Sequence, residues 1–126
     1  MTIHLDTSAL IDVASRPQPL LAAFRRALKD RHVIKTSTIA LYEWLRGPRH
    51  VAELELQRAL CPDEEIVNFG AAEAAVAADL YRRLTRARGR DMDIAIAACA
   101  IAHRAALWTT NVTDFRDIPG LRLYQP

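Results

Sequence analysis

The chain has 126 residues, a length at which one domain buries enough surface to fold without disulfides or metal ions, so we expect a single domain over residues 1–126. Apolar residues make up 51% and charged residues 25%, which excludes a disordered or fibrous chain, and no apolar run approaches the roughly 18 residues of a membrane span. The formal net charge is only +2, but 15 of the 17 basic residues are arginine, the side chain that binds phosphate in a bidentate manner.

The predicted elements begin with a strand and a helix. Residues 2–5 alternate polar and apolar side chains, and residues 6–8 form a turn that can cap a short apolar helix at 8–13. Two prolines then precede apolar residues at helical spacing, which predicts an amphipathic helix over 20–29.

The middle of the chain continues this alternation. A short strand is expected at 33–35, followed by a capped helix that ends at 47–48 and by a further helix over 51–60. Residues 65–69 predict a third strand, and residues 70–87 predict the longest helix. An arginine cluster closes this helix: Arg82, Arg83, Arg86, Arg88 and Arg90. The cluster is either a solvated helix end with cations near its negative dipole or a phosphate-binding face.

The last third of the chain contains the most apolar helix. Residues 93–106 are almost wholly alanine and isoleucine, so we expect a helix buried on most sides. A fourth strand is expected at 107–110, a turn begins at Asp114, and a last edge strand is expected at 121–124. Strands separated by helices predict an α/β domain with a central, mostly parallel sheet that is covered on both faces.

Cellular location is indicated by what the sequence contains near its start and by its cysteines. No cationic segment followed by a long apolar core precedes Asp6, so we expect no secretory signal. Cys61 and Cys99 provide no disulfide framework, and Cys99 lies in an apolar stretch where a small buried thiol packs well. We therefore expect a cytoplasmic protein that does not bind membranes.

Two acidic residues follow predicted strands closely. Functional groups of open parallel sheets collect in the crevice beyond the carboxyl ends of the strands. Asp6 directly follows the first strand, and Asp114 follows the fourth by a few residues. Asp6 could instead cap a helix, although Ser8 already serves for that, and Asp114 could cap a turn. Position alone favours a functional role for Asp6 and leaves both interpretations of Asp114 open.

Two further carboxylates belong to predicted helices. Glu43 lies among apolar residues, where an unpaired buried carboxylate would be costly, so it needs either an ion pair, for example with Arg46, or a bound cation. Asp93 opens the alanine-rich helix, and Asp91 precedes it by two residues. An acid in a first helical turn is ordinary dipole chemistry. A buried helix that presents its positive end and one carboxylate to a strand-end crevice would also form half of a cation site.

Together these carboxylates suggest a metal ion. A set without histidine or cysteine consists of hard oxygen ligands, which select Mg²⁺ or Mn²⁺ over zinc. If Asp6, Glu43, Asp93 and Asp114 converge, setting them aside leaves 17 basic against 11 acidic residues, a surface of +6 around an anionic pocket. Such a surface suits a polyanionic substrate, and a Mg²⁺ ion held in this way can activate water for attack on a phosphodiester.

Four short segments, spread over nearly the whole chain, occur in a characteristic order. They are residues 5–11 (LDTSALI), 42–47 (YEWLRG), 93–100 (DIAIAACA), and 108–115 (WTTNVTDF) together with 118–121 (IPGL). In their order and spacing, these segments resemble the PIN-domain family, and specifically the VapC-type toxins of bacterial toxin–antitoxin pairs. The resemblance implies a three-layer α/β/α fold, Mg²⁺- or Mn²⁺-dependent endoribonuclease activity, an RNA substrate, a cognate antitoxin and a homodimer.

The same resemblance implies roles for individual residues. Asp6 and Asp93 match the metal-ligating acids, and Glu43 and Asp114 complete the catalytic set. The positions matched to substrate binding are Thr7, Ser8, Arg46 and Asn111. Asp93 is favoured over Asp91 because only one of two acids two residues apart on a helix can face the crevice. Asn111 competes with Asp114 for the fourth acidic position.

Other interpretations fit less well. A phosphoacceptor receiver would need two adjacent acids after the first strand and a late lysine, but Asp6 stands alone and the last lysine is Lys35. A haloacid-dehalogenase-like phosphatase would need a second aspartate where the chain has Ser8. The histidines lack zinc-ligand spacing, and Trp44 and Trp108 are expected in the core or in a dimer interface. The remaining alternative is a catalytically silent PIN-like module that binds RNA or an antitoxin.

Overall fold

A computed structural model describes residues 1–15 and 17–126, and these residues form a parallel sheet with the strand order β3-β2-β1-β4-β5. Every strand pair in it is parallel, and Leu5 at the end of the central strand lies opposite Thr36 on one side and Trp108 on the other. The strands are β1 (Thr2–Leu5), β2 (Val33–Ser37), β3 (Ile66–Val67), β4 (Ala106–Trp108) and β5 (Arg122–Leu123). The predicted central sheet is confirmed, and it is parallel throughout.

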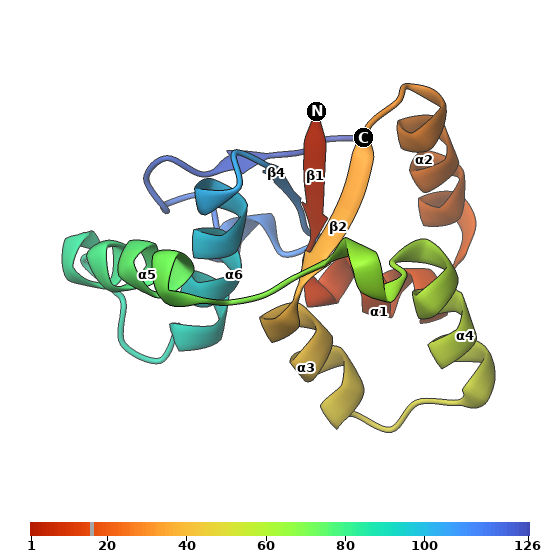
Figure 1. Ribbon diagram of the computed structural model, residues 1–126, viewed down its shortest axis with the longest axis horizontal. Coiled ribbons are helices and arrows are strands. Elements are labelled where there is room, and N and C mark those ends of the chain that lie inside the picture. Colours follow the sequence, from red (N-terminus) through yellow and green to blue (C-terminus); the bar gives the residue numbers. More distant parts are fainter. Residues whose placement is uncertain (16) are drawn as a thin grey trace.

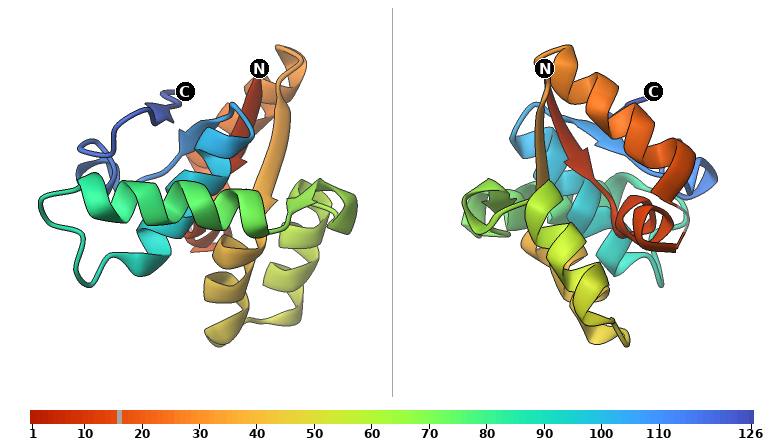
Figure 2. Two further views of the ribbon diagram at one scale, coloured as in Figure 1. Left: turned by 60° about the vertical axis from the view of Figure 1, so that its left-hand side comes forward. Right: turned by 90° about the vertical axis from the view of Figure 1, so that its right-hand side faces the viewer.

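Helices cover both faces of the sheet, as Figures 1 and 2 show. They are α1 (Thr7–Ser15), α2 (Pro17–Lys29), α3 (Thr38–Arg46), α4 (Val51–Leu60), α5 (Ala71–Arg83) and α6 (Asp91–Ala102), with short 3-10 turns η1 (Asp63–Glu65) and η2 (Val112–Asp114). Helices α1, α2 and α4 lie on one side of the strands, and α5 and α6 lie on the other (Figure 1). The three-layer α/β/α fold class is therefore confirmed.

Alternation along the strands separates two apolar cores. Ile3 and Leu5 of β1 pack with Trp108 on the side of α1 and α2, whereas Leu107 packs on the side of α5 and α6. His4 lies between Ile3 and Leu5 in the sequence and therefore faces the α6 side, where its ring lies 5.8 Å from that of His103. Each strand thus contributes side chains to both layers, which fixes its register.

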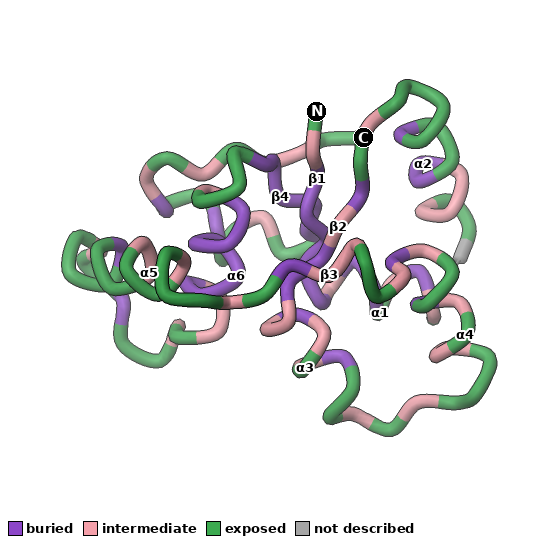
Figure 3. The backbone as a smooth tube through the Cα atoms, in the orientation of Figure 1, coloured by how far each residue is buried: buried purple, intermediate pink, exposed green. Residues whose placement is uncertain are grey.

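Helix α6 is the most deeply buried helix of the described chain. Every residue from Ile94 to Ala100 is buried, and Figure 3 shows this stretch as a continuous buried segment. The small alanine side chains let α6 approach both α5 and the sheet closely, as the composition of this segment predicts. The N-terminus of α6 is thereby held firmly beside the carboxyl ends of the strands.

Some predicted boundaries are wrong, and each difference has a local cause. Helix α6 begins at Asp91 rather than Asp93 and ends at Ala102, where Arg104 turns left-handed (φ 54°) and the chain enters β4 at Ala106. Helix α5 ends at Arg83 rather than near residue 87, because Leu84 already has extended backbone angles.

Two other expectations concern the length of the third strand and the burial of the two tryptophans. The predicted strand at 65–69 is reduced to two residues, Ile66–Val67, because Glu65 belongs to η1. Trp44 and Trp108 are both buried, which confirms their predicted place in the core. No helix within the described ranges is long and apolar enough to cross a membrane.

Candidate metal-dependent active site

The candidate site lies at the carboxyl end of the central strand β1. The Asp6 backbone N–H donates to the carbonyl of Trp108 at 2.9 Å, so β1 and β4 remain paired to their last residues. On the other side, the Thr36 hydroxyl donates to the Leu5 carbonyl at 2.8 Å. The chain runs outward from β1 through β2 to β3 and then crosses to β4 on the other side of β1, so the strand order reverses beside β1, which is where parallel sheets place their binding crevice.

Two hydroxyl groups orient the Asp6 carboxylate. Ser8 Oγ and Thr109 Oγ1 each donate to Asp6 Oδ2 at 2.8 Å. These hydroxyls in turn accept the backbone N–H groups of Thr110 and Asn111, both at 3.0 Å. Within residues 1–15 and 17–126 no hydrogen bond engages Oδ1, so one oxygen of this buried carboxylate is available to a ligand.

Glu43 approaches the same crevice from α3. The Thr7 hydroxyl donates to Glu43 Oε1 at 2.9 Å, and a guanidinium nitrogen of Arg46 lies 3.5 Å from Oε2. The ion pair that the sequence offered as one explanation for Glu43 is therefore present. The Glu43 side chain nevertheless retains 17% of its exposure and lines a pocket, so the ion pair does not remove it from solvent.

The electrostatics of Asp93 show that the predicted acids come together. Burial raises the pKa of Asp93 from its ordinary value of 3.8 to about 6, and repulsion by Asp6, Asp114 and Glu43 adds to the rise. Arg90 opposes it. Asp93 thus lies where several negative charges accumulate, and a cation bound there would relieve the repulsion.

A pocket of about 360 Å³ opens beside Asp93. It is lined by Glu43, Arg46, Gly89, Arg90, Asp91, Met92 and Asp93. In the described part of the chain, no group of three or more histidine, cysteine, aspartate or glutamate side chains is arranged so that it could hold a metal ion. The donor set nevertheless fits Mg²⁺, since this ion keeps several waters and is commonly bound by one or two carboxylates together with substrate phosphates.

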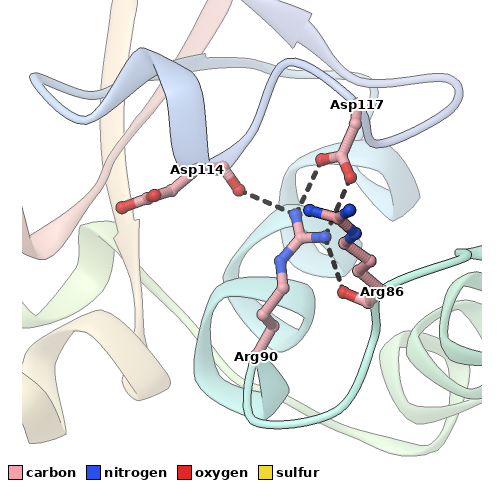
Figure 4. Close-up of polar contacts among 4 residues, drawn as sticks. All are labelled: Arg86, Arg90, Asp114 and Asp117. Carbon is pink, nitrogen blue, oxygen red and sulfur yellow. Dashed lines mark hydrogen bonds and ion pairs between the residues drawn. The ribbon is translucent and has the colours of Figure 1, made fainter.

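The remaining predicted residues lie at the rim of the site. Asp91 is exposed and Asp93 is half-buried, although both belong to the first turn of α6. Asp114 is exposed in η2, and Figure 4 shows its carboxylate turned away from Arg90, which binds the Asp114 carbonyl instead. The Asn111 side chain is also exposed.

Sequence reasoning missed three residues near the site. Thr109 follows β4 as Asp6 follows β1, so its position at a strand end was an available signal. Arg90 was assigned only to the arginine cluster, but it binds Asp117 at 2.7 and 2.9 Å. Nothing in the local sequence marks Asp117. The cluster itself is divided, because Arg83 pairs with Asp79 on α5 at 3.1 Å.

Comparisons with known proteins agree with the fold. A family model described as the PIN domain matches residues 3–121, whereas comparison with curated proteins gives no significant match. Among solved structures, VapBC2 from Rickettsia felis bound to a promoter DNA fragment is 24% identical, with a TM-score of 0.81 and coverage of 98% of each chain. DNA-bound VapBC from Salmonella typhimurium is 21% identical, with a TM-score of 0.82 and coverage of 98% and 97%. A toxin–antitoxin complex from Klebsiella pneumoniae is 25% identical, with a TM-score of 0.67 and coverage of 98% and 99%.

Proposed function

The chain belongs to the PIN-domain family, and on that premise we propose that it is a Mg²⁺- or Mn²⁺-dependent endoribonuclease, the toxin of a cytoplasmic toxin–antitoxin pair. The observation that carries the proposal is the accumulation of carboxylates around the half-buried Asp93: burial raises the pKa of Asp93 to about 6, and repulsion by Asp6, Asp114 and Glu43 adds to the rise. Proteins seldom keep mutually repelling acids at a strand-end crevice unless a cation or a reaction uses them.

The residues of the site have separate roles in the proposed reaction. Asp6 and Asp93 would hold the metal ion, with Asp6 offering the carboxylate oxygen that Ser8 and Thr109 leave free. A bound Mg²⁺ ion supplies a more acidic water and offsets the negative charge that develops at phosphorus. Glu43, oriented by Thr7, lies across the pocket and can accept the proton of the attacking water.

Substrate contacts follow from the groups at the rim. Arg46 lines the pocket beside Glu43 and presents a cation to a phosphate of the RNA. Ser8, which orients Asp6, and Asn111, whose backbone N–H donates to the Thr109 hydroxyl, would contact the RNA strand that is cut. Asp114, at the entrance, completes the acidic set.

The proposed partners rest on the structural likenesses. VapBC and toxin–antitoxin complexes are among the solved structures with this fold, which supports a cognate antitoxin. That the antitoxin covers the acidic pocket and that the chain forms a homodimer are parts of the proposal that the sequence resemblance implies. An antitoxin that inserts a basic segment would occupy the charges that the RNA backbone and the metal ion otherwise engage.

The test is cleavage of labelled RNA by the purified chain with Mg²⁺, with Mn²⁺ and with a chelator. We expect Asp6→Asn and Asp93→Asn to lower the cleavage rate by about 100-fold or more, because each removes a charge that the reaction needs. Asp91→Asn is the matched control, since Asp91 lies in the same helical turn but is exposed. It should retain most of the activity.

The outcomes separate the alternatives. Cleavage that survives the chelator and both substitutions would contradict the carboxylate mechanism. RNA binding without cleavage by the wild-type chain, over a range of RNA sequences and both metals, would favour a catalytically silent module that binds RNA or its antitoxin. Loss of activity in Asp91→Asn with retention in Asp93→Asn would reverse the assignment of the α6 ligand.

A further inference from the structure

Arg90 joins two segments that carry acids of the site. It is the N-cap residue of α6, three positions before Asp93, and its side chain reaches across to η2. Its Nη2 donates to the carbonyl of Asp114 at 2.9 Å, and its Nη1 donates to the carbonyl of Arg86 at 2.9 Å (Figure 4). One guanidinium group therefore binds the backbone of the 84–90 connection and the backbone of η2.

Asp117 completes this arrangement from the chain beyond η2. Arg90 Nη1 donates to Asp117 Oδ2 at 2.9 Å, and Nη2 donates to Oδ1 at 2.7 Å. This is a bidentate pair between two planar groups, a geometry that lysine cannot reproduce. The preceding residue, Gly89, has φ +82°, a conformation that favours glycine and turns the chain so that Arg90 begins the helix.

We propose that Arg90 is a positioning residue that fixes the Asp114 turn relative to the Asp93 end of α6 and thereby sets the affinity of the site for its metal ion. The inference rests on the proposed function. Its basis is that Arg90 binds the carbonyl of Asp114 and leaves the carboxylate turned away (Figure 4). The guanidinium thus fixes the place of this acid without bonding to its carboxylate.

Position and charge predict opposite effects on metal binding. A cation near a metal site opposes the binding of a second cation, so if Arg90 contributed only its charge, Arg90→Gln would bind Mn²⁺ more tightly than wild type. If Arg90 instead acts by holding the Asp114 turn in place, Arg90→Lys keeps the positive charge but loses the bidentate guanidinium geometry, and the affinity for Mn²⁺ falls. Residues that orient metal-binding groups typically contribute about 10- to 100-fold in affinity.

The experiment is Mn²⁺ binding to the full-length chain without RNA, measured from the electron paramagnetic resonance signal of free Mn²⁺. We expect Arg90→Lys to bind Mn²⁺ about tenfold more weakly, and Asp117→Asn, which removes the charge of the bidentate partner but leaves the bond to the Asp114 carbonyl, to weaken binding by less. Arg83→Lys is the matched control, because Arg83 forms an exposed pair with Asp79 on its own helix and, among the described residues, bonds to no second segment. Its affinity should equal that of wild type.

Asp117→Asn also guards against a simple folding defect. It leaves Arg90 able to bind both carbonyl groups, and circular dichroism and urea unfolding in metal-free buffer give the folded fraction of each variant. Wild-type affinity in Arg90→Lys, tighter binding in Arg90→Gln, or weakening that merely follows the unfolded fraction would overturn the inference. A wild-type chain that binds no Mn²⁺ would instead contradict the proposed function itself.

Discussion

The two ends of helix α6 balance their charged groups in different ways. At the N-terminal end, burial and the neighbouring acids raise the pKa of Asp93 to about 6. At the C-terminal end, His103 Nε2 lies 3.1 Å from Glu73 Oε2, and the His103 ring lies 5.8 Å from the tilted ring of the buried His4. Burial lowers the pKa of His4 to about 4, and the charges of His103 and Lys35 add to this effect. The N-terminal end accumulates negative charges that a bound cation would offset. At the C-terminal end the buried His4 stays neutral, and His103 pairs with Glu73.

This difference produces two pH dependences of opposite sign. The folded-state pKa of His4 lies below the unfolded value of 6.5, so unfolding takes up a proton and stability falls as pH decreases from 6.5 to about 4. The folded-state pKa of Asp93 lies above the unfolded value of 3.8, so unfolding releases a proton and stability falls as pH rises from 3.8 through about 6. Between about pH 4 and pH 6 the two contributions offset each other, and single variants should reveal each slope.

The largest effect is expected for His4→Leu. This variant removes the group that must stay neutral, so the stability lost between about pH 7.5 and pH 4 should be smaller than in wild type by about 3 kcal/mol. Urea unfolding in chelator-treated buffer across this range measures the difference. His50→Leu is the control, because His50 is exposed. If the free energy of unfolding of His4→Leu depends on pH as that of wild type does, the buried histidine does not govern the loss of stability at low pH.

The next effect is expected for Asp93→Asn in the absence of metal. Because ionising Asp93 costs free energy in the folded protein, the amide should stabilise the chain above pH 6 by about 2 kcal/mol, a value discounted for partial exposure to solvent, and by little near pH 4. The same unfolding series measures it, with the exposed Asp91→Asn as the control. Saturating Mn²⁺ should reverse the order of wild type and variant, since only the wild type retains the full site. A metal-free Asp93→Asn chain less stable than wild type at pH 8 would contradict the proposed repulsion.

The candidate site follows from residue type and position in the sequence, whereas several boundaries of the elements do not. β1, α3 and the acids that follow strands are encoded by local signals, namely alternation before Asp6 and a cap at Ser37 whose hydroxyl accepts the Ala40 N–H at 3.1 Å. The end of α5 and the start of α6 were missed because the arginine-rich stretch between them has helical propensity, and only tertiary contacts end the helix there. The same limit applies to Arg90, whose partner Asp117 is remote in the sequence.

The positioning hydroxyl of Thr109 was missed for a related reason. Threonine after a strand is common and carries no chemical signature of its own. Its role depends on Asp6, which is joined to it only by the pairing of β1 with β4. Acidic residues could therefore be found from the sequence by their type, whereas the strand-end position of Thr109 acquires a meaning only once β4 is placed beside β1.

The smallest effect is expected for Glu73→Gln at the C-terminal end of α6. Hydrogen bonding to the Gly70 N–H and to His103 lowers the pKa of Glu73, so its charge contributes stability above an ordinary glutamate pKa and loses it as pH falls further. Glutamine can still accept the Gly70 N–H, so we expect the Tm near neutral pH to fall by only about 2 °C, because an exposed pair contributes little. Differential scanning fluorimetry beside Glu55→Gln, an exposed glutamate on α4, measures it. A much larger fall in Tm would mean that the Glu73–His103 pair contributes more to stability than an exposed ion pair does, and the C-terminal end of α6 would then depend on its charges as strongly as the acidic end does.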